Sequence, residues 1–140
     1  EWNGKDIEVS GSSQGGAFAI WAAGCGEGVT RAFSTVTGFC DHGKELVGRL
    51  QGKWPRIKYV PALGYFDTVN FAKRIPATCR VDIPRAGLGD YTCEPSGIAI
   101  LWNNLKCPKT IVWMQGSQHS SNIPPEYKGR DTIRKQGIEQ

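Results

Sequence analysis

Ser13 is the residue of this chain whose surroundings most clearly allow chemistry. It stands in the pentapeptide Gly11-Ser12-Ser13-Gln14-Gly15, after a short apolar run and before a run of small residues. A G-x-S-x-G pattern between a strand and a helix is typical of a nucleophile elbow, a turn so tight that the residues two positions either side of the serine must be very small. Gly11 and Gly15 meet this demand. The pattern predicts Ser13 as a nucleophile for acyl transfer.

Gln14, the next residue, is expected to stabilise the charge that develops in such a reaction. It would be the first residue of a helix, where backbone N–H groups lack acceptors within the helix and the helix dipole is positive. We therefore predict that its backbone N–H is one oxyanion donor. Each such donor contributes roughly 3 kcal/mol of transition-state stabilisation.

The acid and the base are expected beyond the carboxyl ends of later strands, in the chain order serine, acid, histidine. Asp90 follows one strand-like run and His119 follows the next, 29 positions later. One helix and one strand fill that interval and return the chain to the same sheet edge. His119 would take the proton of Ser13, and Asp90 would fix the tautomer of the ring. Singly, Asp90 and His119 also fit ordinary loop positions; the three residues in this order favour catalysis.

Other reactive side chains fit this arrangement less well. His42 precedes both Asp90 and the last predicted strand, so we interpret it as a loop residue or the start of a helix. Asp67 is interpreted as a helix N-cap, and Asp82 as an outward-facing or paired carboxylate on a strand. Cys93 lies close to Asp90, but no activating base adjoins it, so a packed thiol is expected.

The spacing of apolar residues predicts the elements that must position these groups. Strands are predicted over 6–10, 32–39, 78–88 and 109–115. Helices are predicted over 14–24, 41–51, 67–75, 96–105 and 124–140. Strand and helix alternate, and the last strand is a continuous apolar run of the kind found in parallel sheets. The sequence therefore predicts an α/β fold with a mostly parallel sheet.

Composition excludes several other function classes. The 140 residues fit one domain, with 39% hydrophobic and 21% charged residues. No apolar run approaches the ~18 residues of a membrane span, and no segment resembles a signal peptide, so no membrane partner is expected and the localisation stays open between cytoplasmic and exported. The net charge of +4 is scattered, with a locally basic stretch only at 128–135, so no nucleic-acid partner is expected.

Cysteine and histidine spacing bears on metal binding. Five cysteines leave at least one unpaired within the chain, none forms a C-x-x-C motif, and the two histidines lie far apart. Zinc ligands usually come in closely spaced pairs, so a metal site is not expected.

Several motifs together resemble the acetyl xylan esterase and cephalosporin C deacetylase family, carbohydrate esterase family seven. They are the Ser-Gln-Gly elbow at 11–16, the segments 65–72 and 87–96, and Asn103 with Pro108-Lys109. The resemblance extends over about residues 5–120. It implies that Ser13, Asp90 and His119 form the catalytic triad, and that acetyl groups are removed from short acetylated sugars without a metal or organic cofactor. Assembly into homo-oligomers is also implied.

The chain departs from the family pattern at three places. Ser120 follows His119 where the family usually has glutamate, and Glu94 follows Cys93 where it usually has proline. The Arg-Gly-Gln motif, which lies upstream of the elbow in the family, is absent. These departures concern fine specificity and oligomer contacts more than the triad.

The length suggests that residues 1–140 are the C-terminal part of a single α/β-hydrolase catalytic domain. A full α/β-hydrolase has eight strands, and this chain would supply the fifth to the eighth. The strand before Ser13 would then have an unpaired apolar edge. The second oxyanion donor normally comes from an earlier loop. We expect a longer polypeptide or a partner to supply both; a monomer with full esterase activity would contradict this.

Two alternatives to a carbohydrate acetyl esterase stay open at this point. The same triad would serve another acyl-ester hydrolase or a peptidase, because the acyl pocket cannot be read from the sequence. The chain could also be a catalytically silent fragment with an incomplete triad.

Overall fold

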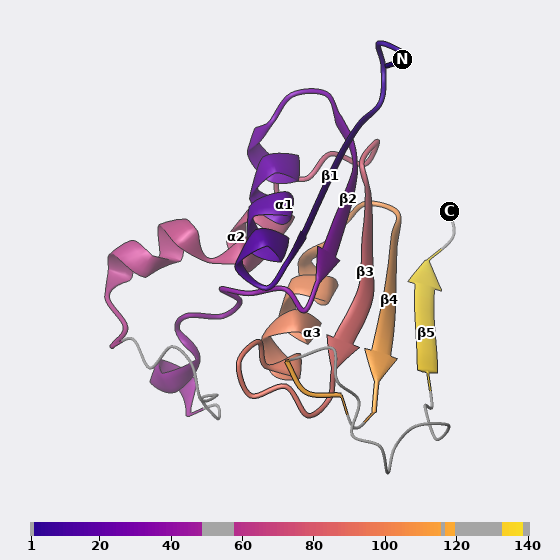
Figure 1. Ribbon diagram of the computed structural model, residues 1–140. Helices are drawn as coiled ribbons and strands as arrows, with labels where there is room; N and C mark the ends of the chain where they lie inside the picture. Colours follow the sequence, from indigo (N-terminus) through magenta and orange to yellow (C-terminus); the bar gives the residue numbers. More distant parts are fainter. Residues whose placement is uncertain (1, 49–57, 116, 120–132, 139–140) are drawn as a thin grey trace.

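The computed structural model describes residues 2–48, 58–115, 117–119 and 133–138 (Figure 1). In this part the strands are β1 (Ile7–Ser12), β2 (Val29–Thr35), β3 (Arg80–Gly87), β4 (Lys109–Met114) and β5 (Ile133–Ile138). The helices are α1 (Gln14–Cys25), α2 (Thr68–Ala72) and α3 (Pro95–Asn104), with 3-10 turns η1 (Lys44–Val47) and η2 (Pro61–Phe66). No helix among the described residues is long and apolar enough to cross a membrane.

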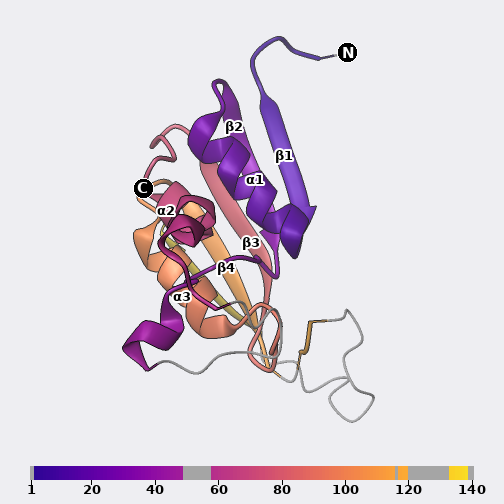
Figure 2. The same cartoon turned by 90° about the vertical axis from the view of Figure 1, so that its left-hand side faces the viewer.

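The sheet order β1-β2-β3-β4-β5 follows the order of the chain. The first four strands are parallel, and β5 is antiparallel to β4. Crossovers between parallel strands are right-handed. Because each strand here lies next to the one that follows it in the chain, the helices that connect the parallel strands all lie on one face of the sheet. The two views show α1, α2 and α3 on that face (Figures 1 and 2). The predicted α/β fold with a mostly parallel sheet is confirmed, and it places the carboxyl ends of β1 to β4 at one edge.

The core lies between the helices and the sheet. Val81 and Ile83 of β3 and Ile111 of β4 point to the helical face and are buried against α3, which contributes Ile98 and Leu101. Successive residues of a strand point to opposite faces of the sheet. The neighbours of these buried residues along β3 and β4 therefore point to the face without helices. The rigid layer formed in this way is what positions the loops after β3 and β4.

Asp82 lies on the opposite face of the sheet and is the paired carboxylate that the sequence predicted. Its side chain is 7% exposed. One oxygen lies 2.8 Å from Arg31 Nη2, the other lies 3.0 Å from Arg80 Nε, and the Thr110 hydroxyl donates to it as well. Burial by itself would raise the pKa of this carboxyl, but the Thr110 hydroxyl and the two guanidinium groups outweigh it and hold the pKa below its ordinary value.

The turn from β1 to α1 has the strained geometry of a nucleophile elbow. Ser13 has φ 57° and ψ −117°, and its N–H donates to Thr35 O at 2.9 Å. A Cβ added at Gly11 would lie 2.1 Å from Gly15 O, so glycine is required there. At Gly15 the expected crowding is not observed, since an added Cβ would meet nothing within 4 Å. The close packing falls instead on Gly16, whose added Cβ would lie 2.8 Å from Ser34 Oγ.

Three predicted elements end earlier than expected. The strand predicted over 32–39 ends at Thr35, because Val36 has φ 42° and turns the chain toward Ser13. The helix predicted over 41–51 is reduced to the short 3-10 turn η1, between Gly43 and Gly48, whose φ is +70°. Residues 49–51 lie outside the described part. The helix predicted over 67–75 is shortened to α2.

The closing helix predicted over 124–140 is wrong where the structure describes it. Residues 133–138 form β5, which pairs antiparallel with β4 from Lys109↔Ile138 to Met114↔Ile133. A polar segment with helical propensity here takes strand geometry because the outer edge of β4 offers a row of backbone hydrogen-bonding groups, and tertiary pairing overrides local propensity. The rest of the predicted helix lies outside the described residues.

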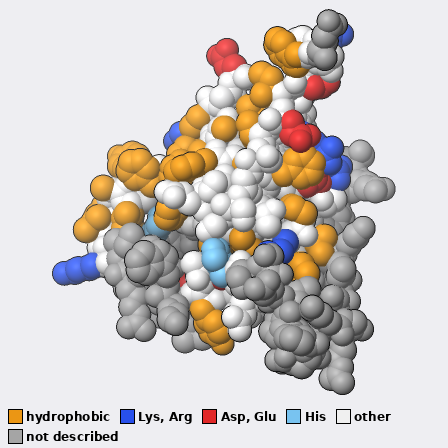
Figure 3. Space-filling view, viewed as in Figure 1, with side chains coloured by type: hydrophobic (Ala, Val, Ile, Leu, Met, Phe, Trp, Pro, Cys, Tyr) orange, Lys and Arg blue, Asp and Glu red, His pale blue; other side chains and the backbone are white. Residues whose placement is uncertain are grey.

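β1 lies at the other edge of the sheet. It pairs with β2, and its second edge has no partner among the described residues. Ile7 is 38% exposed there, and Figure 3 shows hydrophobic side chains at the surface of this part of the molecule. The unpaired edge predicted for this strand is confirmed in the described part.

Replacing Asp82 by Asn should destabilise the fold by about 1–3 kcal/mol at pH 7, because the substitution leaves buried donors with a weaker acceptor. The pKa of Asp82 is lower in the folded than in the unfolded chain. Its stabilisation is therefore complete above the ordinary value near 4 and is lost as the pH falls through the lower folded value. Urea unfolding of D82N and wild type should differ at pH 7 and converge in acid. Glu8→Gln, an exposed change on β1, should stay within about 0.5 kcal/mol at every pH.

Gly11→Ala should cost about 3 kcal/mol or more, because the new methyl group meets backbone that cannot move aside. Gly15→Ala is the matched control four residues away. It occupies open space in a helix and should be neutral or stabilising by up to about 1 kcal/mol. Thermal melts of the two variants test the elbow geometry, and equal melting temperatures would contradict it.

Candidate active site

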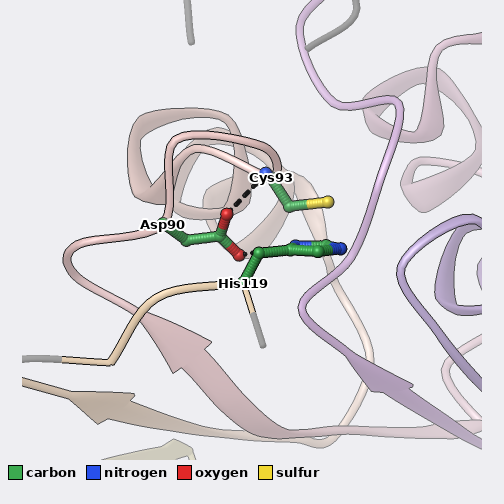
Figure 4. Close-up of side chains that lie close together, drawn as sticks. All are labelled: Asp90, Cys93 and His119. Carbon is green, nitrogen blue, oxygen red and sulfur yellow. Dashed lines mark hydrogen bonds and ion pairs between the residues drawn. The ribbon is translucent and has the colours of Figure 1, made fainter. Parts of the chain in front are cut away.

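The predicted acid and base lie in the loops that follow β3 and β4, and the structure brings them together. Asp90 follows β3, His119 follows β4, and Asp90 Oδ2 lies 3.0 Å from His119 Nδ1. A Cβ added at Gly87 would lie 2.5 Å from Ser117 O, so the two loops leave β3 and β4 in close contact. Figure 4 shows the side chains of Asp90 and His119 meeting above the strand ends.

The Asp90 carboxylate is buried and held by several donors. The residue is 2% exposed, and Oδ1 accepts hydrogen bonds from the N–H groups of Thr92 at 2.8 Å and Cys93 at 2.9 Å. These two bonds fix one oxygen and direct the other to His119. Such a carboxylate can hold the ring in the tautomer that keeps Nε2 free to accept a proton.

Arg85 of β3 holds the segment that carries His119. Its Nη2 donates to the carbonyl oxygens of Gln118 at 2.9 Å and His119 at 3.2 Å, and its Nε donates to Ser117 Oγ at 3.3 Å. The backbone around His119 is therefore anchored to the sheet, while the ring itself is 33% exposed. This leaves the ring accessible from solvent.

Cys93 connects Ser13 to the Asp90–His119 pair. Its Sγ lies 3.8 Å from Ser13 Oγ, and Sγ, a His119 ring nitrogen and an Asp90 carboxylate oxygen all lie within 4.8 Å of one another. In Figure 4 the thiol and the ring extend in the same direction, away from the carboxylate. The half-buried hydroxyl of Ser13 thus contacts the thiol that lies next to Asp90 and His119.

The Cys93 thiol is packed, as expected from the sequence. Burial raises its pKa to about 12; the Ser13 hydroxyl opposes the shift, and the Asp90 and Glu94 carboxylates add to it. A thiol with this pKa is neutral near pH 7, and neutral thiols are poor nucleophiles. The role of Ser13, on the strained turn, as the nucleophile stays a prediction.

The loop 36–41 presses against the elbow in a strained conformation. Val36, Phe39 and Asp41 all have positive φ, at 42°, 54° and 61°. The N–H of Gly38 donates to Ser13 O at 3.0 Å, which ties this loop to the turn that carries Ser13. Strained backbone of this kind is found where a fold over-determines a functional geometry.

Asp67 supports this loop from α2. It caps α2 by accepting from the N–H of Val69, which confirms its prediction as an N-cap. The same carboxylate accepts from the N–H groups of Asp41 at 3.0 Å and His42 at 2.7 Å. His42 is therefore a loop residue, as interpreted from the sequence.

Gln14 is the first residue of α1, so its backbone N–H lies at the positive end of that helix. A Cβ added at Gly38 would lie 3.4 Å from Gln14 N, so loop 36–41 approaches the elbow closely at this point. The role of Gln14 as an oxyanion donor stays a prediction.

Three contacts of this site were not found from the sequence. The approach of Cys93 to Ser13 spans 80 positions and has no local signal. The anchoring role of Arg85 depends on the alignment of β3 with the loop after β4, and the second role of Asp67 depends on the loop 36–41. A partial signal exists for Cys93 alone, because an Asp-x-x-Cys spacing suits a turn in which the aspartate accepts from the backbone N–H three residues later.

Comparison with known proteins places this chain in a family. A family model described as acetyl xylan esterase (AXE1) matches residues 56–131. The acetyl esterase Axe7A of Xylanibacter ruminicola is 33% identical over 145 residues, which cover 97% of this chain and 32% of that protein. The solved acetyl xylan esterase from Paenibacillus sp. R4 is 28% identical with a TM-score of 0.71, over 89% of this chain and 42% of that one.

A second solved structure agrees with these matches. Acetyl xylan esterase 1 from Thermoanaerobacterium sp. is 25% identical with a TM-score of 0.68, over 93% of this chain and 44% of that one. The chain thus spans between about a third and somewhat less than half of the length of these relatives. Its fold is part of an α/β-hydrolase fold, and its identity to Axe7A extends over nearly all of its residues. The chain belongs to the acetyl xylan esterase family.

Proposed function

We propose that this chain carries the catalytic residues of a serine esterase that removes acetyl groups from acetylated sugars or oligosaccharides. The observation that carries the proposal is the Asp90–His119 hydrogen bond of 3.0 Å beside a serine in a strained elbow, in a chain of the acetyl xylan esterase family. Ser13 is the nucleophile, His119 the general base and acid, and Asp90 the group that orients the ring. The reaction needs no metal or organic cofactor.

The first half of the reaction forms an acetyl-enzyme. Ser13 Oγ attacks the acetyl carbonyl carbon while His119 takes the hydroxyl proton, and the Gln14 N–H stabilises the oxyanion of the tetrahedral intermediate. When the intermediate collapses, the bond between the carbonyl carbon and the sugar oxygen breaks. His119 returns the proton to that oxygen, and the deacetylated sugar leaves.

The second half hydrolyses the acetyl-enzyme. His119 takes a proton from water, whose oxygen attacks the acetyl carbon of acetyl-Ser13. The new tetrahedral intermediate releases Ser13 Oγ, which regains its proton from His119, and acetate leaves. Asp90 stabilises the imidazolium that forms in both halves.

The contact between Ser13 and Cys93 fits a resting state of this cycle. A thiol is a weak hydrogen-bond donor and acceptor, so it holds Ser13 Oγ loosely at 3.8 Å. The hydroxyl can leave this partner for the nearby ring of His119 when substrate binds. A strong acceptor at the same place would compete with the ring for the proton.

The complete enzyme requires more than the described residues supply. We propose that the chain is the C-terminal part of one catalytic domain, and that its remaining part covers the edge of β1 and provides the second oxyanion donor. Assembly into a homo-oligomer is part of the same proposal. The coverage of 32% to 44% of the relatives' lengths supports the first of these points.

The nucleophile is tested by labelling with a fluorophosphonate probe. Ser13→Ala should abolish both labelling and hydrolysis of acetyl esters, whereas Ser12→Ala, the neighbouring exposed serine, should retain both. Asp90→Asn should lower kcat by about 10⁴-fold with little change in KM, because the ring loses its correct tautomer. These measurements use the longer polypeptide that includes the proposed remaining part of the domain. Retained labelling in S13A would exclude this nucleophile, and absence of labelling in that wild-type polypeptide would indicate a silent triad.

The acyl specificity is tested by comparing aryl esters of increasing acyl length. We expect kcat/KM to fall steeply from acetyl to butyryl and longer groups, since the proposed substrates carry acetyl groups alone. Release of acetate from acetylated xylo-oligosaccharides should accompany this preference. A preference for long acyl chains or for peptides would instead indicate another acyl hydrolase with the same triad.

A further inference from the structure

Three side chains with metal-binding atoms meet at one point of the site. The Asp90 carboxylate, the Cys93 thiol and a ring nitrogen of His119 each offer one atom, and these atoms lie within 4.8 Å of one another. The ligand atoms of a tetrahedral zinc ion are roughly 3.3–3.8 Å apart, given bonds of about 2.0–2.3 Å. Shifts of about an ångström would therefore close this group around an ion (Figure 4).

The types of the three ligand atoms determine which metal ion the group would favour. One sulfur, one imidazole nitrogen and one carboxylate oxygen form a set that suits Zn²⁺, whereas Mg²⁺ and Ca²⁺ take oxygen ligands. Ser13 Oγ, 3.8 Å from the sulfur, is close enough to approach the fourth position, or a water molecule can fill it. Cys93 and His119 come from different loops, so the spacing of cysteines and histidines in the sequence does not reveal this group.

We propose that Asp90, Cys93 and His119 form an inhibitory site for Zn²⁺, at which the ion binds reversibly and blocks the proposed esterase reaction. As the sulfur–zinc bond forms, the Cys93 thiol releases its proton to solvent. His119 Nδ1 and Asp90 Oδ2, which now share a hydrogen bond of 3.0 Å, both bind the ion in its place. Nδ1 gives its proton to solvent and Nε2 takes one up, so the ring stays neutral and Nδ1 offers its lone pair to the ion. Nε2 then carries a proton and cannot accept that of Ser13. Metal binding itself does not depend on the proposed function; only its inhibitory effect does.

Burial and access are compatible with a site of this kind. Asp90 and Cys93 are buried, at 2% and 6% exposure, whereas the His119 side chain is 33% exposed. An ion therefore enters past the ring, which lies in a loop segment that is anchored through its backbone by Arg85. Oδ1 of Asp90 stays on its two backbone donors, so the carboxylate can bind the ion through Oδ2 without leaving the loop.

Cd²⁺ provides a direct readout, because cadmium bound to a thiolate absorbs in the ultraviolet. The background is Cys25→Ala, which removes the exposed thiol. Titration should give one Cd²⁺ per chain, displaced by Zn²⁺. Cys93→Ala should abolish the band and His119→Gln should weaken binding by at least about 10-fold. Cys79→Ala, a buried thiol at the entry to β3, should leave the band unchanged.

The alternatives to this site give distinct results. A band that survives Cys93→Ala and disappears in Cys79→Ala would place the metal elsewhere and overturn the proposal. If Cys93→Ala does not fold, Cys93→Ser keeps the size of the side chain and should still lack the band. These outcomes do not require esterase activity, so they separate the metal site from the proposed function.

The inhibitory effect is tested on turnover. Zn²⁺ should lower acetyl-ester hydrolysis, a chelator should restore it, and Cys93→Ser should need at least about 10-fold more Zn²⁺ for half-inhibition than its own parent. Cadmium binding without any loss of turnover would contradict the inhibitory role.

Discussion

The hydrogen bond between Asp90 and His119 depends on the parallel alignment of β3 with β4. Because both strands end at the same edge, the loops that follow them start in contact, with Gly87 beside the carbonyl of Ser117. A side chain at position 87 would meet that carbonyl at 2.5 Å and separate the loops. The core beneath, with α3 packed on both strands, holds this alignment. The geometry of the Asp90–His119 pair is thus a property of the sheet more than of either loop.

Ser13, the proposed nucleophile, is positioned in a different way, by strained backbone that is held from several sides. Ser13 adopts a positive φ because the turn is closed by Gly11 against Gly15 O. Loop 36–41, itself strained at three residues, donates to Ser13 O, and the Asp67 carboxylate holds that loop from α2. Each strained residue costs about 1–3 kcal/mol, so such a cluster persists only where the surrounding contacts determine it. The support of Ser13 therefore extends as far as α2.

The sequence was sufficient where a rule is local or follows from chain order. The strained turn at Gly11 and Ser13 was predicted from a five-residue pattern. The meeting of Asp90 and His119 was predicted from their places after two apolar strands. Asp67 and Asp82 were interpreted correctly for similar reasons. The contact of Cys93 with Ser13, the anchoring by Arg85 and the pairing of β5 with β4 were not found, because each joins segments that no local pattern relates. At β5, pairing with the open edge of β4 outweighs the helical propensity of the segment.

Cys93 shows how a property useful for the reaction also exposes the site to metal. The side chain that faces Ser13 must fill space without binding the hydroxyl strongly, and a buried neutral thiol does this better than a hydroxyl or a carboxylate. The same sulfur is the softest ligand that could be placed between a carboxylate and an imidazole. A serine there would bind zinc poorly but would compete with His119 for the proton of Ser13. The sulfur of Cys93 is therefore both the weak hydrogen-bond partner of Ser13 and the soft ligand for zinc. A substitution at this position changes both properties together.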